Sequence, residues 1–223
     1  MSAGVIAGGA ARIEDLPAVF PVFPLDGALL LPRGGLPLNI FEPRYLNMVD
    51  DVMAGDRMLG MISTLPGPDP TLPPLASVGC LGRVTSFSET PDGRYLITLT
   101  GVCRFTVGEE LPVRTPYRQV RAAFDAFSAD LDASGVDLNL DRDRLLDALR
   151  AYLDKHGLDI EWDTARAAPP EALVNSLSMA LPFAAPEKQA LLEAADLPER
   201  ESVLVALLEI EAAAADDDPR SIQ

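Results

Sequence analysis

Few residues in this chain have the side chains that enzymes commonly use as nucleophiles or bases. The 223 residues include one histidine, His156, and two lysines, Lys155 and Lys188. A catalytic lysine needs an apolar, desolvated setting that lowers its pKa, whereas both lysines here have charged or polar neighbours in segments with a helical pattern. His156 precedes Gly157 at the expected end of a helix, where a cation meets the negative end of the helix dipole. We therefore expect structural roles for all three side chains and no catalytic residue.

The sequence also lacks the motifs of metal, nucleotide and zinc-peptidase chemistry. It contains no HExxH or CxxC spacing, and Cys80 and Cys103 lie in separate strand-like runs, so we expect two reduced core thiols rather than a metal pair. No GxxxxGK[ST] loop is present to bind the phosphates of ATP. Paired carboxylates such as Asp50 and Asp51 are common in an acidic chain and do not indicate catalysis. The sequence predicts no cofactor, no metal site and no enzyme.

The residues best suited to binding lie between Phe41 and Met61. Methionine is flexible and polarizable, which suits surfaces that accept varied apolar side chains, and four methionines lie here; an ordinary core patch is the alternative reading. Arg44 could hold a peptide carboxylate through a bidentate contact, or form a structural salt bridge with Glu42 or Asp50. We predict a peptide-binding set that consists of Phe41, Arg44, Tyr45, Met48 and Met61.

These candidates lie in a segment whose residue pattern changes twice, from strand-like to irregular and then to helical. Residues 22–31 read as a strand, proline and glycine then interrupt the pattern, and an extended stretch follows up to Phe41. Pro43 suits the first turn of a helix, and Gly55 is expected to end that helix in a left-handed conformation. The proline- and glycine-rich residues 32–37 leave backbone polar groups that could pair with an added peptide strand.

The pattern after this helix predicts more strands and then helices. Five prolines in residues 65–75 indicate an exposed loop. Alternation over residues 78–107 around Asp92-Gly93 predicts a hairpin, with a bend or bulge at Gly101. Further short strands are expected at residues 19–25, 112–113 and 117–124. Helices are expected to begin near Asp141, Pro169-Pro170, Pro186 and Pro198.

The order of these pieces resembles the N-terminal substrate-binding domain of the ATP-dependent Lon proteases, which is PUA-like. The motifs that carry the resemblance are Phe23-Pro24-Leu25, Leu31-Pro32 to Leu36-Pro37-Leu38, Ile40 to Tyr45, Gly79 with Gly82 and Val84, Gly101 with Arg104 and Phe105, and residues 189–211. The likeness covers about residues 19–210 and is weakest between Phe124 and Leu140. It implies a stand-alone member of this family, without the ATPase and peptidase modules.

We therefore predict an α+β fold in which a small PUA-like β-barrel with one inserted helix precedes a bundle of about four helices. The expected organisation is a flexible arm at residues 1–16, the barrel at 17–127, a linker at 128–140, the helical bundle at 141–212 and an acidic tail at 213–223.

Charge and hydropathy limit the partners. The formal net charge is −16, and residues 121–223 hold 22 of the acidic residues against 9 basic ones. Such a field repels phosphate backbones. No apolar run of about 20 residues could span a bilayer, and the first 20 residues do not read as a secretory signal. We expect a cytoplasmic protein that binds neither nucleic acid nor membranes, and the sequence does not fix its oligomeric state.

The resemblance and the missing catalytic motifs together predict a non-catalytic module that recognises proteins or peptides, as an adaptor or scaffold in protein quality control. Its partners would be protein or peptide clients, and a separate protease is a further candidate partner. The alternative, from the general habits of the PUA-like fold, is a module that binds a small molecule or RNA. RNA binding at physiological salt would favour that alternative, and the negative charge predicts none.

Overall fold

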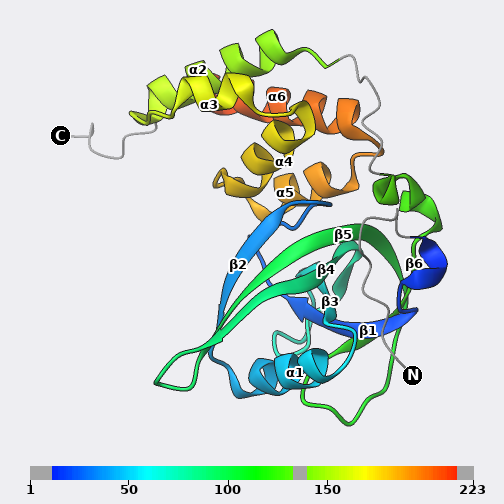
Figure 1. Cartoon of the computed structure of the whole chain (residues 1–223). Helices are drawn as coiled ribbons and strands as arrows, with labels where there is room; N and C mark the ends of the chain where they lie inside the picture. Colours follow the sequence, from blue (N-terminus) through cyan, green and yellow to red (C-terminus); the bar gives the residue numbers. More distant parts are fainter. Residues whose placement is uncertain (1–11, 133–139, 215–223) are drawn as a thin grey trace. The chain divides into compact units, whose positions relative to one another are not determined.

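A computed structural model of the chain describes residues 12–132 and 140–214 (Figure 1). They form a six-stranded sheet and a series of helices, so the predicted α+β class is confirmed. The chain divides into two compact units. The sheet unit comprises the residues up to 136 together with 175–193, and the helical unit comprises 137–174 together with the residues from 194 onward. The finer predicted boundaries stay predictions, and much of the predicted arm, linker and tail lies outside the described residues.

The sheet curls because the last strand in its pairing order also pairs with an earlier strand. Its strands are β1 (Val19–Pro24), β2 (Gly35–Ile40), β3 (Met58–Thr64), β4 (Leu75–Glu89), β5 (Tyr95–Glu110) and β6 (Gln119–Ala123). The long β5 pairs with β2, β4 and β6, and β6 also pairs with β1. Among the strands that the structure describes, β1 and β3 form the one parallel pair. The closed form of the predicted barrel stays a prediction. The strand expected at residues 112–113 is wrong, because these residues lie in the loop after β5.

The helix α1 (Pro43–Ala54) covers one end of the curled sheet (Figure 1) and starts at Pro43, as predicted. Its inward side consists of the buried residues Tyr45, Met48, Val49 and Val52. Its end differs from the prediction, since Gly55 has φ −110° and is not left-handed. The positive φ falls on Arg57 instead, at 59°. The amides of both residues donate to the carbonyl oxygen of Val52, which turns the chain into β3.

Strands β4 and β5 form a long hairpin whose turn projects from the rest of the sheet (Figure 1). The predicted Asp92-Gly93 turn is confirmed, with Gly93 at φ +78°. The predicted alternation is confirmed as well, since Ile97 and Leu99 are buried while Leu96, which precedes them on the other face, is exposed. This alternation is what a strand with one face on the core requires.

Gly101 marks a bulge in β5, as the sequence indicates. The register shifts there, because Leu81 pairs with Cys103 whereas Gly82 pairs with Gly101. A Cβ atom at Gly101 would overlap the carbonyl oxygen of Leu31. The loop before β2 therefore crosses β5 at a distance that only glycine permits.

The helices after the sheet begin at the predicted places, apart from one short helix that the sequence pattern did not reveal. They are α2 (Arg142–His156), α3 (Trp162–Ala167), α4 (Pro170–Ala180), α5 (Ala185–Glu193) and α6 (Leu197–Ala213), with short 3-10 helices at Ile13–Asp15 and Asp125–Leu131. Asp141 caps α2 by accepting from the amide of Arg144 at 3.1 Å, and Gly157 ends it at φ 63°. Within the helical unit α2 packs along α6. The α5 helix belongs to the sheet unit, and the four-helix bundle stays a prediction.

Candidate functional site

The five predicted peptide-binding residues are divided between surface and core. Tyr45, Met48 and Met61 are buried, and the ring of Tyr45 packs against Phe23 with 4.3 Å between centroids. Phe41 is 64% exposed, and Arg44 also lies at the surface. The structure therefore brings only Phe41 and Arg44 within reach of a partner, and the methionines fit the core alternative.

Arg44 forms the structural salt bridge that the sequence offered as its other role. Its Nη2 atom lies 2.8 Å from Oε2 of Glu42, and its guanidinium lies 4.5 Å from the centroid of the Tyr45 ring. Burial is the main cause that raises the pKa of Tyr45, and Arg44 partly opposes it. Because the pair with Glu42 is solvent-exposed, exchanging Glu42 for a carboxylate of a partner would cost little.

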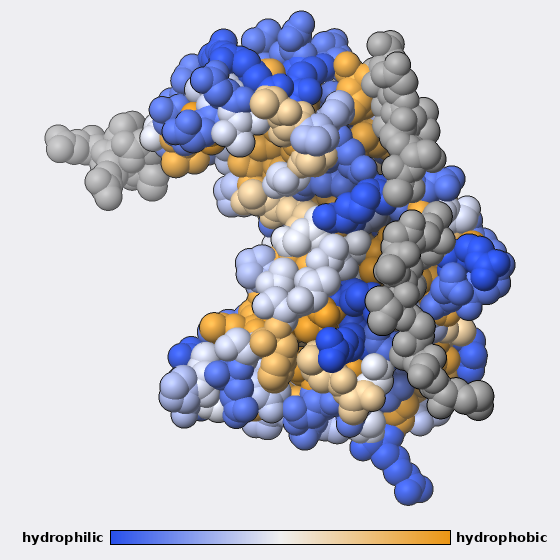
Figure 2. All heavy atoms as spheres, viewed as in Figure 1, coloured by the Kyte–Doolittle hydropathy of each residue, from blue (hydrophilic) through white to orange (hydrophobic). Residues whose placement is uncertain are grey.

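Exposed apolar side chains gather where β2, β5 and β4 end together. Leu96 is 46% exposed and lies opposite Asn39, so continued alternation puts Phe41 on the same face as Leu96. Phe87 is 40% exposed and lies on the other face, where its ring packs against Tyr95 with 5.0 Å between centroids. We call Phe41, Phe87, Tyr95 and Leu96 the strand-end patch. Figure 2 shows hydrophobic residues reaching the surface among hydrophilic ones in this part of the sheet unit.

The outer edge of β2 adjoins this patch. Among the described strands β2 pairs only with β5, and the amide of Gly101 donates to the carbonyl oxygen of Gly34. Since bonding alternates along an antiparallel pair, Leu36 and Leu38 bond to β5 while the backbone of Pro37 faces outward. Pro37 has no N–H, so the open edge offers acceptors but an interrupted row of donors. The backbone groups expected to be free in residues 32–37 are thus only partly available to an added strand.

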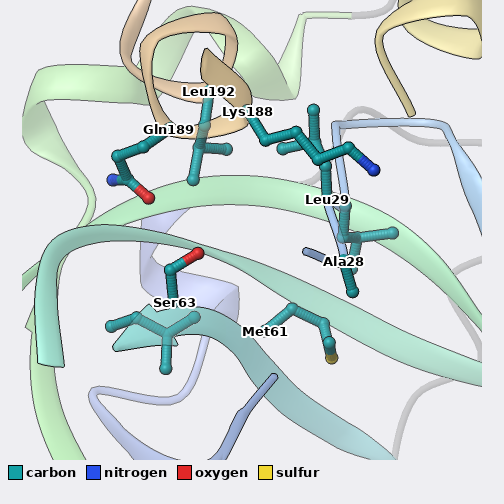
Figure 3. Close-up of a pocket in the computed structure, with 9 residues that line it drawn as sticks. Ala28, Leu29, Met61, Ser63, Lys188, Gln189 and Leu192 are labelled. Carbon is teal, nitrogen blue, oxygen red and sulfur yellow. The ribbon is translucent and has the colours of Figure 1, made fainter. Parts of the chain in front are cut away.

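A small cavity beneath α5 can be excluded as a peptide site by its size. Met61, Ser63, Lys188 and Gln189 line it together with neighbours shown in Figure 3, and its volume is about 10 Å³. That is room for about one water molecule. The Oε1 atom of Gln189 is buried there without a protein partner, and the Ser63 hydroxyl faces the same space (Figure 3). The cavity suits an ordered water and cannot admit a client side chain.

Lys188 beside this cavity is desolvated, contrary to the expectation of polar surroundings. It is buried, and its Nζ atom donates to the carbonyl oxygen of Gly27 at 2.7 Å. Burial lowers the pKa of its ammonium group. The local pattern does not indicate this burial, because the residue lies on a helix with polar neighbours in sequence. Its contacts with backbone oxygen nevertheless fit the expected structural role, since the adjoining cavity is too small for a substrate.

Lys155 and His156 have contacts that fit the structural roles predicted for them. The Nζ atom of Lys155 donates to the carbonyl oxygen of Glu211 at 2.7 Å within the helical unit. The ring of His156 packs against Tyr152 with 4.4 Å between centroids, in the last turn of α2. In residues 12–132 and 140–214 no group of three His, Cys, Asp or Glu side chains could hold a metal ion. None of the helices in these ranges is both long and apolar enough to cross a bilayer.

The sequence identified part of the strand-end patch and missed the rest. Phe41 was predicted, whereas Phe87 and Leu96 were not, although Leu96 alternates with buried residues in a strand. An apolar residue on the outward side of a predicted strand is the signal that could have identified Leu96. The pattern did not indicate Phe87, because it lies on the same face of the hairpin as the buried Ile97 and is nevertheless 40% exposed.

Comparison with known proteins gives a consistent result. Residues 19–209 match the family model described as the ATP-dependent protease La (LON) substrate-binding domain. The chain is 26% identical over 208 residues to Lon protease 2 of Myxococcus xanthus, and 29% identical over 200 residues to Lon protease 2 of Sorangium cellulosum. These matches cover 87% and 84% of this chain but 24% of each relative. The chain thus spans about a quarter of the length of these relatives.

Solved structures show the same fold. A Lon N-terminal domain protein from Xanthomonas campestris has a TM-score of 0.60 and 23% identity, over 84% of this chain and 97% of that one. The N-terminal domain of the Lon protease of the Mycobacterium avium complex has a TM-score of 0.61 and 17% identity, over 85% and 97%. Together with the match over residues 19–209, these likenesses show that the chain belongs to the family of the ATP-dependent protease La (LON) substrate-binding domain.

Proposed function

We propose that this chain recognises client proteins by binding their extended, apolar segments at the strand-end patch, and that it does so without catalysing a reaction. The observation that carries the proposal is the gathering of Phe41, Phe87 and Leu96 at the end of three paired strands, in a member of a substrate-binding family. Exposed apolar side chains that gather at one place often mark an interaction site.

The residues around the patch suit an unfolded partner. Phe41 and Leu96 on one face and Phe87 on the other would accept apolar side chains without demanding one sequence. Arg44 and Glu42 follow Phe41 closely in the chain and have opposite charges, so a client side chain of either charge could form an ion pair there. The buried Tyr45, Met48 and Met61 would act from beneath, by holding α1 on the sheet.

In cells this recognition would serve protein quality control, with the chain as an adaptor or scaffold in the cytoplasm and a separate protease as its partner. The proposal rests on the substrate-binding family to which the chain belongs. The acidic surface disfavours RNA as the ligand, since a net charge of −16 repels phosphate.

Fluorescence anisotropy with a labelled, permanently unfolded model polypeptide tests the proposal. We expect Phe41→Asp and Leu96→Asp to weaken binding about tenfold or more, because a carboxylate at an apolar contact must be desolvated. Leu158→Asp is the matched control, since Leu158 is also exposed, at 54%, but lies in the helical unit. Equal binding by all three variants and the wild type would contradict the patch. Labelled RNA of mixed sequence, at physiological salt, tests the alternative ligand.

A further inference from the structure

A second cavity in the sheet unit lies at the C-terminal end of α1, apart from the strand-end patch. Its volume is about 150 Å³, it is open to solvent, and residues of α1, of β1 and near the starts of β3 and β6 line it. A cavity of about this size can hold a benzene molecule, whereas drug-sized ligands need roughly 300 Å³ or more. The cavity therefore has room for one side chain or a similarly small group.

Its walls differ in chemistry from its rim. Val19, Pro21 and Met58 supply apolar wall, while Asp51 and Asp56 supply carboxylates. Both aspartates are exposed to solvent, and neither is in an ion pair with a cation among the residues that the structure describes. An apolar wall below a negative rim suits a ligand with an aliphatic stem and a cationic end.

One of the carboxylates is held in place from below. The hydroxyl of Tyr117 donates to Oδ2 of Asp51 at 2.5 Å, and Tyr117 itself is buried. Burial first, and then this hydrogen bond, raise the pKa of Tyr117 to about 12, so the phenol keeps its proton at neutral pH. The bond leaves Oδ1 of Asp51 for a second donor and fixes the direction in which the carboxylate faces.

The backbone beside the cavity belongs to a strand with neighbours on both sides. Residues 19–21 of β1 pair with β6 on one side. On the other side lies the start of β3, because the parallel register that pairs Val22 with Gly60 sets Phe20 level with Met58. A client side chain therefore enters the cavity from its solvent side, without pairing of the client backbone with β1.

We propose that this cavity takes the side chain of a lysine or arginine of a client polypeptide, with its stem against Val19, Pro21 and Met58 and its cation between Asp51 and Asp56. The inference rests on the proposed function and adds a charge preference to it. The protein would then have two distinct contacts with a client. Apolar side chains of the client would bind at the strand-end patch, and a cationic side chain would bind in this cavity. The net charge of −16 favours the approach of basic segments.

Matched peptides test this proposal by fluorescence anisotropy. One labelled peptide carries a single arginine in an otherwise neutral, extended sequence, and a second carries citrulline, which has the same shape without the charge. We expect the wild type to bind the arginine peptide about tenfold more tightly, and added salt to reduce this difference. Asp56→Asn should abolish the preference. Asp147→Asn, which removes the same charge from an exposed position on α2, should retain it.

The outcomes separate this proposal from the proposed function. If unfolded polypeptide binds and Phe41→Asp weakens it, but arginine and citrulline peptides bind equally, the cavity proposal fails and the proposed function stands. If unfolded polypeptide does not bind the wild type, the proposed function fails, and the peptide pair still tests the cavity. A third ligand, agmatine, has a guanidinium on an aliphatic stem but no peptide backbone. If agmatine binds tightly at Asp56 while the two peptides bind equally, the proposal that the ligand is a polypeptide is contradicted. Asp51→Asn is a second variant, checked for folding by circular dichroism because Asp51 also binds Tyr117.

Discussion

The guanidinium of Arg104 and the carboxylate of Asp130 form a bidentate pair inside the sheet unit, with Nε–Oδ2 and Nη2–Oδ1 distances of 2.8 Å. Their side chains are 3% and 9% exposed. The backbone amide of Arg104 also donates to Oδ2 of Asp130, and Nη1 donates to the carbonyl oxygen of Leu192. A single arginine on β5 thus binds both the 3-10 helix at 125–131 and the end of α5.

Replacing one partner of this pair should destabilise the protein strongly. Arg104→Met leaves the buried Asp130 without the guanidinium that satisfies both of its oxygens, and such losses cost about 3–5 kcal/mol. Urea unfolding measures the change. The control is Arg94→Met, because the pair of Arg94 with Asp92 is exposed and worth less than about 1 kcal/mol. Adding Asp130→Leu to Arg104→Met should restore part of the loss, and equal stability of the two single variants would contradict the role assigned to the buried pair.

This pair also shows where prediction from sequence ends. Arg104 belongs to a local motif, Gly101 with Arg104 and Phe105, which the sequence displays directly. Asp130 lies in a polar stretch that reads as a linker, and its burial depends on the position of β5, which is distant in sequence. Local period and capping residues define the strands and most helices. They contain no information about which polar residue of a loop folds back into the core.

Gly101 should not tolerate a side chain, whereas Gly35 should. A Cβ at Gly101 would overlap the carbonyl oxygen of Leu31 and approach Cα of Pro32 to 3.2 Å, and backbone atoms cannot move aside as a side chain can. We expect Gly101→Ala to lower the free energy of unfolding by about 1–3 kcal/mol, as overpacking does. At Gly35 a Cβ would meet no atom within 4 Å, so Gly35→Ala should change it by less than about 1 kcal/mol. Thermal unfolding of the two variants compares them, and an equal effect would contradict the close approach at the bulge.

The two cysteines should not react with thiol reagents in the folded protein. Cys80 and Cys103 are buried thiols that form no disulfide in the part of the chain that the structure describes, and burial is the main cause that raises the pKa of Cys103 to about 12. Because the thiolate is the reactive form, an aromatic disulfide reagent at pH 8 should label neither residue until the protein is unfolded in guanidinium chloride, when both react. Since the unfolded thiol has the lower pKa, the stability contributed by Cys103 should be present below pH 9 and fall as the pH rises toward 12. Rapid labelling of the folded protein would contradict this burial.

The candidate site was harder to predict than the fold, for a physical reason. The spacing of apolar residues, three and four positions apart, places Tyr45 and Met48 on one side of α1. It does not indicate whether that side faces a client or the core. The structure buries both. Phe41 is exposed because it lies between the end of β2 and the start of α1, where none of the described elements covers it. Exposure of this kind is decided by tertiary contacts, so the sequence could nominate Phe41 but not separate it from its buried neighbours.

The buried Lys188 should make stability depend on alkaline pH in a specific direction. Burial lowers the pKa of its folded form below the ordinary value of 10.5, so the unfolded chain binds the proton more tightly. The contribution of this residue therefore becomes more favourable as the pH rises from the folded pKa toward 10.5. We expect the free energy of unfolding of the wild type, relative to Lys188→Met, to increase as the pH rises toward 10.5. Urea unfolding at several pH values measures the difference, and a difference that does not change with pH would contradict the desolvation of Lys188.

Pro37 should limit strand addition at the open edge of β2. Its outward-facing backbone lacks an N–H, so an added strand loses one bond in the middle of the edge. Pro37→Thr restores that donor and introduces a residue with high β-propensity. We expect this variant to self-associate at concentrations where the wild type does not, as measured by sedimentation velocity. Thr98→Val provides the control, because Thr98 lies opposite Pro37 on β5 and its substitution leaves the donors of the edge unchanged. If Pro37→Thr stays as monodisperse as the control, something other than the missing donor protects the edge of β2. A client would then be expected to bind at the strand-end patch and not along this edge.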